Sequence, residues 1–305
     1  MKTFIKNFSK KITKNFRFRI RSLKFGLNKK KYRKFPLTQL KSFTLNELNP
    51  IPNGWHTGGP DFIGIGTNKA GTTWWYSLLL EHPQIVNNRL NKKELRYFVH
   101  FGYKGLNEYD IETYNQAFVA PNGSICGEWS PIYLSHPLCI KHIAEVAPNA
   151  RILIILRNPV DRLISFLNGS SYWISRYHFN PEQQYVFNSF YVYPRAMKSS
   201  LYADDLRQLL RYFDREHILI HQYEKCKIDP LHEIAHTYRF LGVDEGFQPQ
   251  SIKRWINRKK YIIPRLNPEE RQFLVDYFAE DVHLTIKMFP EIDISLWKDF
   301  DVKKF

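Results

Sequence analysis

The stretch DFIGIGTNKAGTTWWYSLLLEH, residues 61–82, decides the fold of this 305-residue chain. Its first part, residues 61–66, is short and mostly apolar, which predicts a strand. Its last part, residues 72–82, is rich in Trp and Leu and precedes Pro83, which predicts a helix that ends near this proline. A loop containing glycine therefore joins a strand to a helix.

This loop has the glycine spacing of a phosphate-binding loop, but its lysine is displaced. Gly66 and Gly71 fit the motif G-x-x-x-x-G-K-[ST], whereas the lysine is Lys69, inside the loop, and Thr72 and Thr73 follow the second glycine. The backbone N–H groups of such a turn attract an anion, to which the lysine and the threonines would add charge and hydroxyl donors. The alternative is an ordinary tight turn with an exposed lysine.

Two further apolar segments predict strands. ILIIL (152–156) is a continuous apolar run, typical of a parallel strand buried on both faces, and HILIH (217–221) is the second. Helical patterns alternate with the strands and cover residues 160–167, 201–213, 231–241 and 267–288. This alternation predicts an α/β protein with a P-loop-like three-layer fold, in which helices flank a mostly parallel central sheet.

A second polar cluster follows the strand at 152–156, in the sequence LRNPVDRLISF. Arg157 comes directly after the strand, where open α/β sheets bind ligands, and Ser165 lies two helical turns further on. Arginine and serine suit a second phosphate, although a surface helix with an Asp161–Arg162 pair is an open alternative. Neither predicted strand end supplies the acid that would hold magnesium, so we expect fixed cations, without a metal, to hold the phosphates.

Basic charge is concentrated at the N-terminus. Residues 1–35 contain 14 of the 45 Lys and Arg residues and no Asp or Glu, so the rest of the chain is nearly neutral. Large apolar residues recur there mostly every three or four positions, which favours an amphipathic helix on an anionic membrane surface. A solvated leader and an organellar transit segment are the alternatives. Because the remainder is nearly neutral, no nucleic-acid partner is expected.

We expect three parts: the leader at 1–35, a linker rich in Pro and Gly at 36–60, and a folded domain at 61–305. The three cysteines have no metal-ligand spacing and favour buried thiols in a reducing compartment. The sequence contains no run of about 18 apolar residues and no secretory signal. The expected location is therefore cytoplasmic, peripheral at the membrane.

The two polar clusters together resemble the sulfotransferase superfamily, whose donor is 3′-phosphoadenosine 5′-phosphosulfate (PAPS). TNKAGTTWWYSLLLEHPQI (67–85) is similar to the family's 5′-phosphosulfate loop, and RILIILRNPVDRLISFLN (151–168) is similar to its 3′-phosphate motif. NKKELRYF (91–98) and CGEWSPIYL (126–134) resemble the K-E-x-H-F-F and G-E-K-S-P-x-Y segments of the carbohydrate, heparan-sulfate-like branch. The resemblance covers about residues 60–298.

The resemblance implies transfer of a sulfuryl group from PAPS to a hydroxyl or amine of a carbohydrate or glycolipid acceptor. Glu94 would be the general base, with His136 and Glu128 in reserve, and Lys69 would stabilise charge on the departing phosphate. No metal is implied. The implied donor contacts are Lys69, Ala70, Gly71, Thr72, Thr73, Trp74, Arg157, Ser165, Arg258 and Lys260.

Three positions depart from the family pattern. Arg96 takes the place of the histidine in K-E-x-H-F-F, Trp129 replaces a lysine, and the segment 257–266 lacks the family's glycine. Trp129 could stack on a sugar ring or be buried in the core. Two other classes stay open: a P-loop NTPase or kinase with an atypical loop, and a protein that binds a membrane or nucleic acid through its basic N-terminus.

Overall fold

The computed structural model describes residues 43–101, 105–136, 138–176, 192–253 and 266–300. Contacts between residues divide the chain into two units, and the second, Lys41–Phe305, contains all of the described residues. The basic leader predicted at residues 1–35 lies outside the described residues. The same holds for Arg258 and Lys260.

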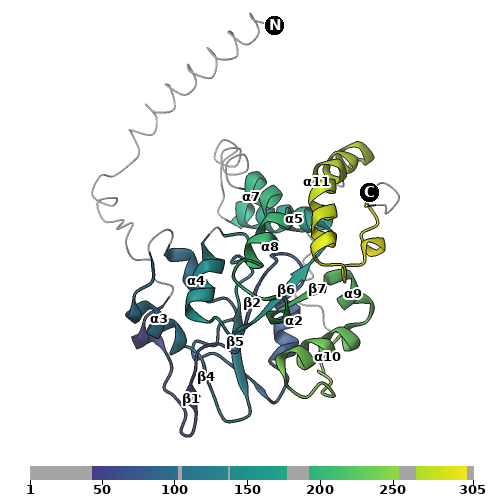
Figure 1. The fold of residues 1–305 in the computed structure, drawn as a ribbon. Helices are drawn as coiled ribbons and strands as arrows, with labels where there is room; N and C mark the ends of the chain where they lie inside the picture. The colour runs from purple at the N-terminus through teal and green to yellow at the C-terminus, as the bar shows by residue number, and fades with distance from the viewer. Residues whose placement is uncertain (1–42, 102–104, 137, 177–191, 254–265, 301–305) are drawn as a thin grey trace, which may run out of the picture. The chain divides into compact units, whose positions relative to one another are not determined.

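A five-stranded sheet forms the centre of the domain, and each neighbouring pair of strands runs parallel (Figure 1). This confirms the predicted fold class. A small antiparallel pair joins β1 (His56–Thr57) to β4 (Val119–Ala120). The order in the central sheet is β3 (Ile85–Asn87), β5 (Ile125–Trp129), β2 (Phe62–Gly66), β6 (Arg151–Leu156) and β7 (Ile218–Gln222).

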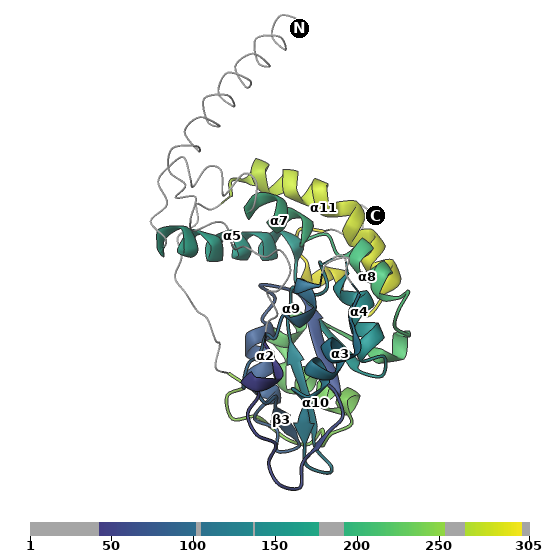
Figure 2. The ribbon, with the colours of Figure 1, turned by 90° about the vertical axis from the view of Figure 1, so that its left-hand side faces the viewer.

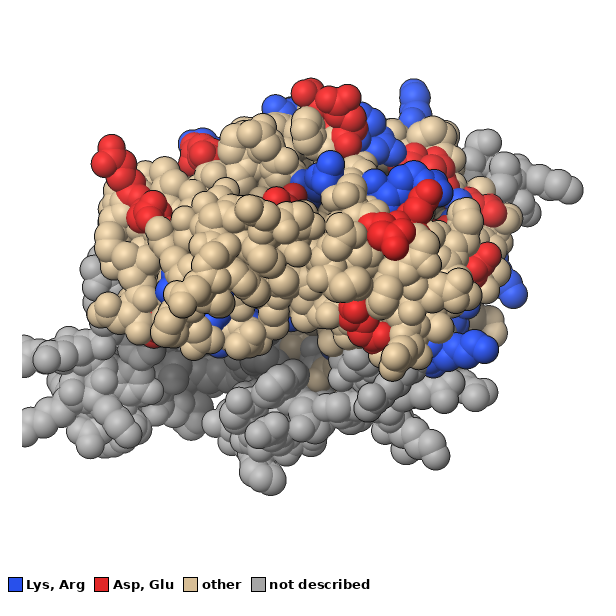
Figure 3. All heavy atoms as spheres, turned by 90° about the horizontal axis from the view of Figure 1, so that it is seen from below, with Lys and Arg blue, Asp and Glu red and all other residues tan. Residues whose placement is uncertain are grey.

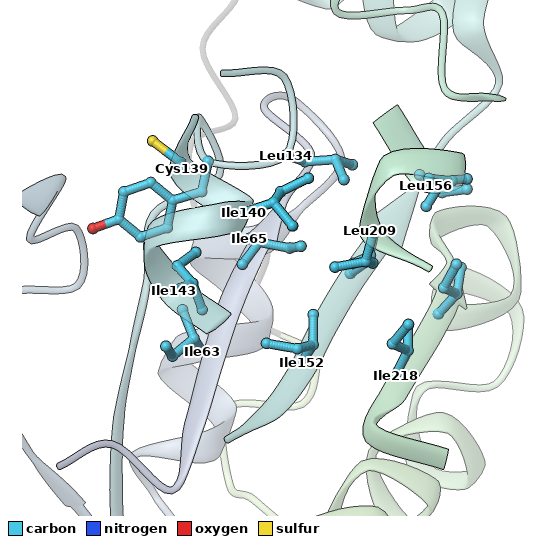
Figure 4. Close-up of a cluster of buried hydrophobic side chains, with 14 of the residues drawn as sticks. Ile63, Ile65, Leu134, Cys139, Ile140, Ile143, Ile152, Leu156, Leu209 and Ile218 are labelled. Carbon is cyan, nitrogen blue, oxygen red and sulfur yellow. The ribbon is translucent and has the colours of Figure 1, made fainter. Parts of the chain in front are cut away.

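The sheet lies between two helical layers, and alternate residues of its strands face each layer. On one face, Ile63, Ile152 and Ile218 join a core cluster with α4 (Cys139–Val146) and α8 (Ala203–Leu209) (Figure 4). The same cluster includes residues of α3 (Glu108–Asn115) and α11 (Pro268–Met288). On the other face, a second cluster joins the strands to α2 (Thr72–Leu79) and α10 (Pro230–Leu241). Burial on both faces explains the continuous apolar run in β6.

Three helices gather beyond one end of the sheet. Figure 2 shows α5 (Pro159–Arg176), α7 (Tyr193–Lys198) and α11 near one another there. The helix predicted at 160–167 is thus more than twice the predicted length. In the described part of the chain the remaining elements are α9 (Tyr223–Ile228) and four 3₁₀ turns, η1 (Leu45–Glu47), η2 (Tyr97–His100), η4 (Arg215–His217) and η5 (Ile294–Leu296).

The described part of the predicted linker makes specific contacts with the domain. Phe43 is 1% exposed, and its ring centroid lies 5.0 Å from that of Tyr97, while β1 pairs with β4. Within the described residues, no helix is long and apolar enough to cross a bilayer. The three cysteines are buried free thiols. On the face seen in Figure 3, basic side chains lie among acidic ones.

Trp129 at the end of β5 is packed against the centre of β2. Its side chain is 0% exposed, and its indole Nε1 donates a hydrogen bond to the carbonyl oxygen of Gly66 at 3.1 Å. A Cβ atom at Gly64, which pairs with Trp129 in the sheet, would lie 2.1 Å from the indole ring. Trp129 is therefore a core residue beneath the loop, and not a surface on which a sugar could stack.

We expect Gly64→Ala to destabilise the domain. The added methyl group must displace the buried indole ring, and overpacking of this kind typically costs about 1–3 kcal/mol. The free energy of unfolding, measured by denaturant titration, should fall by this amount. Gly58→Ala is the matched control, because a Cβ there meets nothing within 4 Å. Equal stability of the two variants would contradict the packing described here.

Candidate active site

The loop between β2 and α2 has the backbone shape of an anion site. Gly71 caps α2 in the left-handed region, with φ of 86°, and no side chain caps the helix. Lys69 also has a positive φ, of 70°. The first amides of a helix have no carbonyl partner within it, so they can donate to an anion at this end. Thr72 and Thr73 occupy the first turn.

Two arginines from the region after β6 hold the carbonyl oxygens of the loop. Arg157 Nη1 donates to the oxygen of Lys69 at 3.0 Å, and Arg162 Nη1 donates to the oxygen of Asn68 at 3.1 Å. Arg162 is 0% exposed, and its other donors reach Ser199, Ser200 and the oxygen of Ala196. The two predicted motifs thus lie side by side, and the arginines after β6 hold the loop between β2 and α2 in place.

The alternative of a surface Asp161–Arg162 pair is wrong. Asp161 accepts a hydrogen bond from Arg271 Nη2 at 2.9 Å, while the guanidinium of Arg162 is buried. Within the described residues no carboxylate is paired with Arg162, and burial lowers its pKa to about 10. A cation in this position favours a nearby anion.

Arg157 has the surroundings of a ligand-binding arginine. Its guanidinium carbon lies 4.8 Å from the centre of the Tyr223 ring, a cation–π contact. A Cβ at Gly71 would lie 2.8 Å from the same ring, so Tyr223 packs against both motifs. The Nε atom of Arg157 is buried and has no hydrogen-bond partner in the described part of the chain. A buried donor of this kind fits an anionic ligand at the site.

Lys69 extends to α5, the helix that contains Ser165. A Cβ at Gly169 would be 2.4 Å from the Nζ atom of Lys69, so the lysine side chain extends over this glycine. Ser165 is half-buried and precedes Gly169 by four residues, which places both on the same face of α5. The predicted donor residues Lys69, Arg157 and Ser165 therefore face one region beyond the end of β6.

A lysine that sequence reasoning did not assign connects the loop to Glu94. Lys93 Nζ donates to Thr72 Oγ1 at 3.0 Å and to Glu94 Oε1 at 3.4 Å. Burial lowers the pKa of Lys93 to about 8, although the charge of Glu94 opposes this shift. Arg96 Nε donates to Glu94 Oε2 at 2.9 Å. Glu94 thus lies beside the loop with cations on both of its oxygens.

A buried carboxylate positions the segment that carries Glu94. Glu128 is 0% exposed and accepts four hydrogen bonds, from the amide of Leu95 and the hydroxyls of Tyr114, Ser130 and Tyr133. Burial raises the pKa of Glu128, and these bonds oppose the rise. Since both oxygens are enclosed, Glu128 is suited to fixing the backbone beside Glu94 and not to receiving a proton from an acceptor.

The other predicted residues, Ala70, Trp74 and His136, differ in how far they are buried. Ala70 and Trp74 are both buried and belong to the core cluster on the face of the sheet that α2 and α10 cover. His136 is half-buried; burial, with the charges of His142, Arg195 and His100, lowers its pKa. A lowered pKa keeps this histidine neutral and able to accept a proton.

Comparison with known proteins places these motifs in a family. A family model described as a sulfotransferase domain matches residues 59–261, more than half of the chain. The crystal structure of a sulfotransferase from Alicyclobacillus acidocaldarius superposes with a TM-score of 0.59 over 79% of this chain and 99% of that one, at 24% identity. This likeness agrees with the fold.

Two curated relatives share part of their length with the chain. A membrane-associated sulfotransferase, kil1, of Dictyostelium discoideum is 34% identical over 128 residues, which are 42% of this chain and 26% of the relative. A bifunctional heparan sulfate N-deacetylase/N-sulfotransferase 4 of Mus musculus is 27% identical over 262 residues, 72% of this chain and 29% of the relative. The chain thus spans less than a third of either relative. The model of the sulfotransferase domain, by contrast, matches residues 59–261 of this chain. This chain belongs to the sulfotransferase family.

Proposed function

We propose that the protein transfers a sulfuryl group from PAPS to a hydroxyl or amine of a carbohydrate or glycolipid. The observation that carries this proposal is the junction of the loop with Arg157, whose buried Nε atom needs an acceptor. A loop for one phosphate and an arginine for another match a donor that has phosphates at both its 5′ and 3′ positions.

The donor would be held by fixed cations and backbone donors. Lys69, the first amides of α2 and the hydroxyls of Thr72 and Thr73 would bind the 5′-phosphosulfate, and Gly71 permits the close approach. Arg157 and Ser165 would bind the 3′-phosphate. Arg258 and Lys260 remain predicted contacts. We propose that binding needs no metal, because the cations supply the positive charge.

Sulfuryl transfer to an alcohol requires removal of the acceptor proton as its oxygen attacks sulfur. Glu94 would accept this proton, since a hydroxyl is a poor nucleophile at neutral pH without a positioned base. Lys69 would stabilise the charge that develops on the departing phosphate. Lys93, which is bonded to Thr72 and to Glu94, would bind an oxygen of the transferring group.

The acceptor class rests on relatives, one of which is named for heparan sulfate. We propose a carbohydrate acceptor for this reason. For residues 1–35 we propose contact with an anionic membrane surface, because the segment is strongly basic and contains regularly spaced apolar residues. The name of the Dictyostelium relative describes that protein as membrane-associated.

Calorimetry with nucleotides tests the donor assignment. We expect adenosine 3′,5′-bisphosphate, the product of the donor, to bind in the presence of a chelator. ATP should bind much more weakly with or without magnesium, because the proposed site suits a phosphate at each of the 3′ and 5′ positions of the ribose. Comparable ATP binding that requires magnesium would instead favour an NTPase or a kinase.

Arg157→Ala provides the matched variant in the same experiment. Loss of a charge-assisted hydrogen bond should weaken the binding of adenosine 3′,5′-bisphosphate by about 1.5–3 kcal/mol, which raises its dissociation constant roughly 10- to 150-fold. Adenosine 5′-phosphosulfate lacks the 3′-phosphate, so its affinity should change little. Equal losses for both nucleotides would remove Arg157 from the 3′-phosphate site.

Glu94→Gln should lower kcat by about 10²–10⁴-fold, the usual range for a general base. The amide keeps the shape of the side chain but cannot accept the proton, so the donor's dissociation constant should remain nearly unchanged. Glu216→Gln, on an exposed 3₁₀ turn, is the control. Turnover of the Glu94 variant within a few-fold of wild type would transfer the role of base to His136.

Donor affinity should depend on pH through Lys93. The pKa of Lys93 is about 8 in the free protein, and an anion favours the protonated form. Affinity is therefore full well below pH 8 and should fall by up to about tenfold between pH 7 and pH 9. Lys93→Met should flatten this dependence, whereas Lys92→Met, at an exposed neighbouring position, should not. An unchanged profile in the Lys93 variant would contradict the role given to this lysine.

A further inference from the structure

A compact group of metal-ligating side chains lies outside the active site, between β7 and α10. His221 comes from the strand, and Glu233 and His236 come from the helix. One ligand atom from each of the three lies within 4.8 Å of the others. The helix contributes the sequence HEIAH, residues 232–236, in which Glu233 and His236 are three residues apart and share a face.

His221 is held as metal-ligating histidines usually are. Its Nε2 atom lies 2.8 Å from Thr237 Oγ1, which accepts a hydrogen bond from Trp75 Nε1 at 3.0 Å. Its Nδ1 atom lies 2.7 Å from Glu233 Oε2. A hydrogen bond at one ring nitrogen fixes the orientation of the ring and presents the other nitrogen toward the ligands.

Exposure of the group increases from one member to the next. His221 is 1% exposed and Glu233 is 9% exposed, whereas His236 is open to solvent, with its ring centroid 5.7 Å from that of His221. An ion could therefore enter from the side of His236, and a water molecule could complete its coordination.

We propose that His221 Nδ1, a carboxylate oxygen of Glu233 and a ring nitrogen of His236 bind one Zn²⁺ ion. Two nitrogens and one carboxylate oxygen suit this ion, with a water as the fourth ligand. The site differs from the H-E-x-x-H zinc site of metalloproteases, in which both helix histidines bind and the glutamate is a base. Here the glutamate faces the strand histidine, so the ion would join β7 to α10.

The proposed ion would lie close to residues that support the loop between β2 and α2. His221 precedes Tyr223 by two residues, and the Tyr223 ring packs against Gly71. Trp75, whose indole is bonded to Thr237, belongs to the helix that starts at this loop. The bound ion would stabilise these elements without touching the donor, and its binding does not depend on the proposed reaction.

Titration of the chelator-treated full chain with Co²⁺ and then Zn²⁺ tests the proposal. We expect one Co²⁺ per chain with the visible absorption of a four-coordinate ion, displacement by Zn²⁺, and a higher melting temperature with Zn²⁺. His236→Gln alters an exposed residue and should fold normally, yet bind Zn²⁺ at least about tenfold more weakly and lose the stabilisation.

His232→Gln is the matched control, because His232 is an exposed histidine of the same helix outside the proposed set. Its affinity for Zn²⁺ should stay within about threefold of wild type, well below the tenfold loss expected for a ligand. Equal losses of Zn²⁺ affinity in the two variants would show that the ion is bound by His232 and His236, a surface pair four residues apart. That result would overturn the assignment of His221 and Glu233. Absence of Co²⁺ absorption in the wild-type chain would overturn the site itself.

Discussion

The site depends on two arginine hydrogen bonds to consecutive carbonyl oxygens of one loop. Arg162 holds the oxygen of Asn68, and Arg157 holds the oxygen of Lys69. Because the guanidinium groups of Arg157 and Arg162 hold these carbonyls, the loop is fixed at the point where α2 begins with uncapped amides. Both arginines follow β6, so the order of strands in the sheet, β2 beside β6, is what brings the two motifs into contact.

A second set of contacts comes from β5, the other neighbour of β2 in the sheet, and holds the segment that carries Glu94. Trp129 ends β5 and Ser130 follows it, and they bond to backbone groups of Lys93 and Arg96, while Glu128 holds the amide of Leu95. Hydrogen bonds of buried groups to backbone fix position more strictly than apolar packing, because geometry must be met. The proposed base and the donor loop are thus carried by strands that are adjacent in the sheet.

Much of this could be predicted from sequence because the signals are local. The strand, loop and helix at 61–82 are contiguous, and the apolar run 152–156 specified both a buried strand and the position of Arg157. Other features depend on residues far apart in the chain. Nothing near Trp129 in sequence shows that its ring lies under Gly64, and only the fold shows that Lys93 reaches Thr72. Burial of Arg162 was equally hidden, since Asp161 beside it suggested an ion pair.

The contact between Gly64 and Trp129 also constrains how the sequence can vary over evolution. A side chain at position 64 would require a smaller residue at position 129, and that residue would lose the hydrogen bond from the indole to the oxygen of Gly66. Residues in such contact have coupled effects on stability. Among homologues that keep tryptophan at this place in β5, the facing position in β2 should be invariant glycine, whereas homologues with lysine there are free to vary it. The two positions should therefore change together, as a covarying pair separated by 65 positions along the chain.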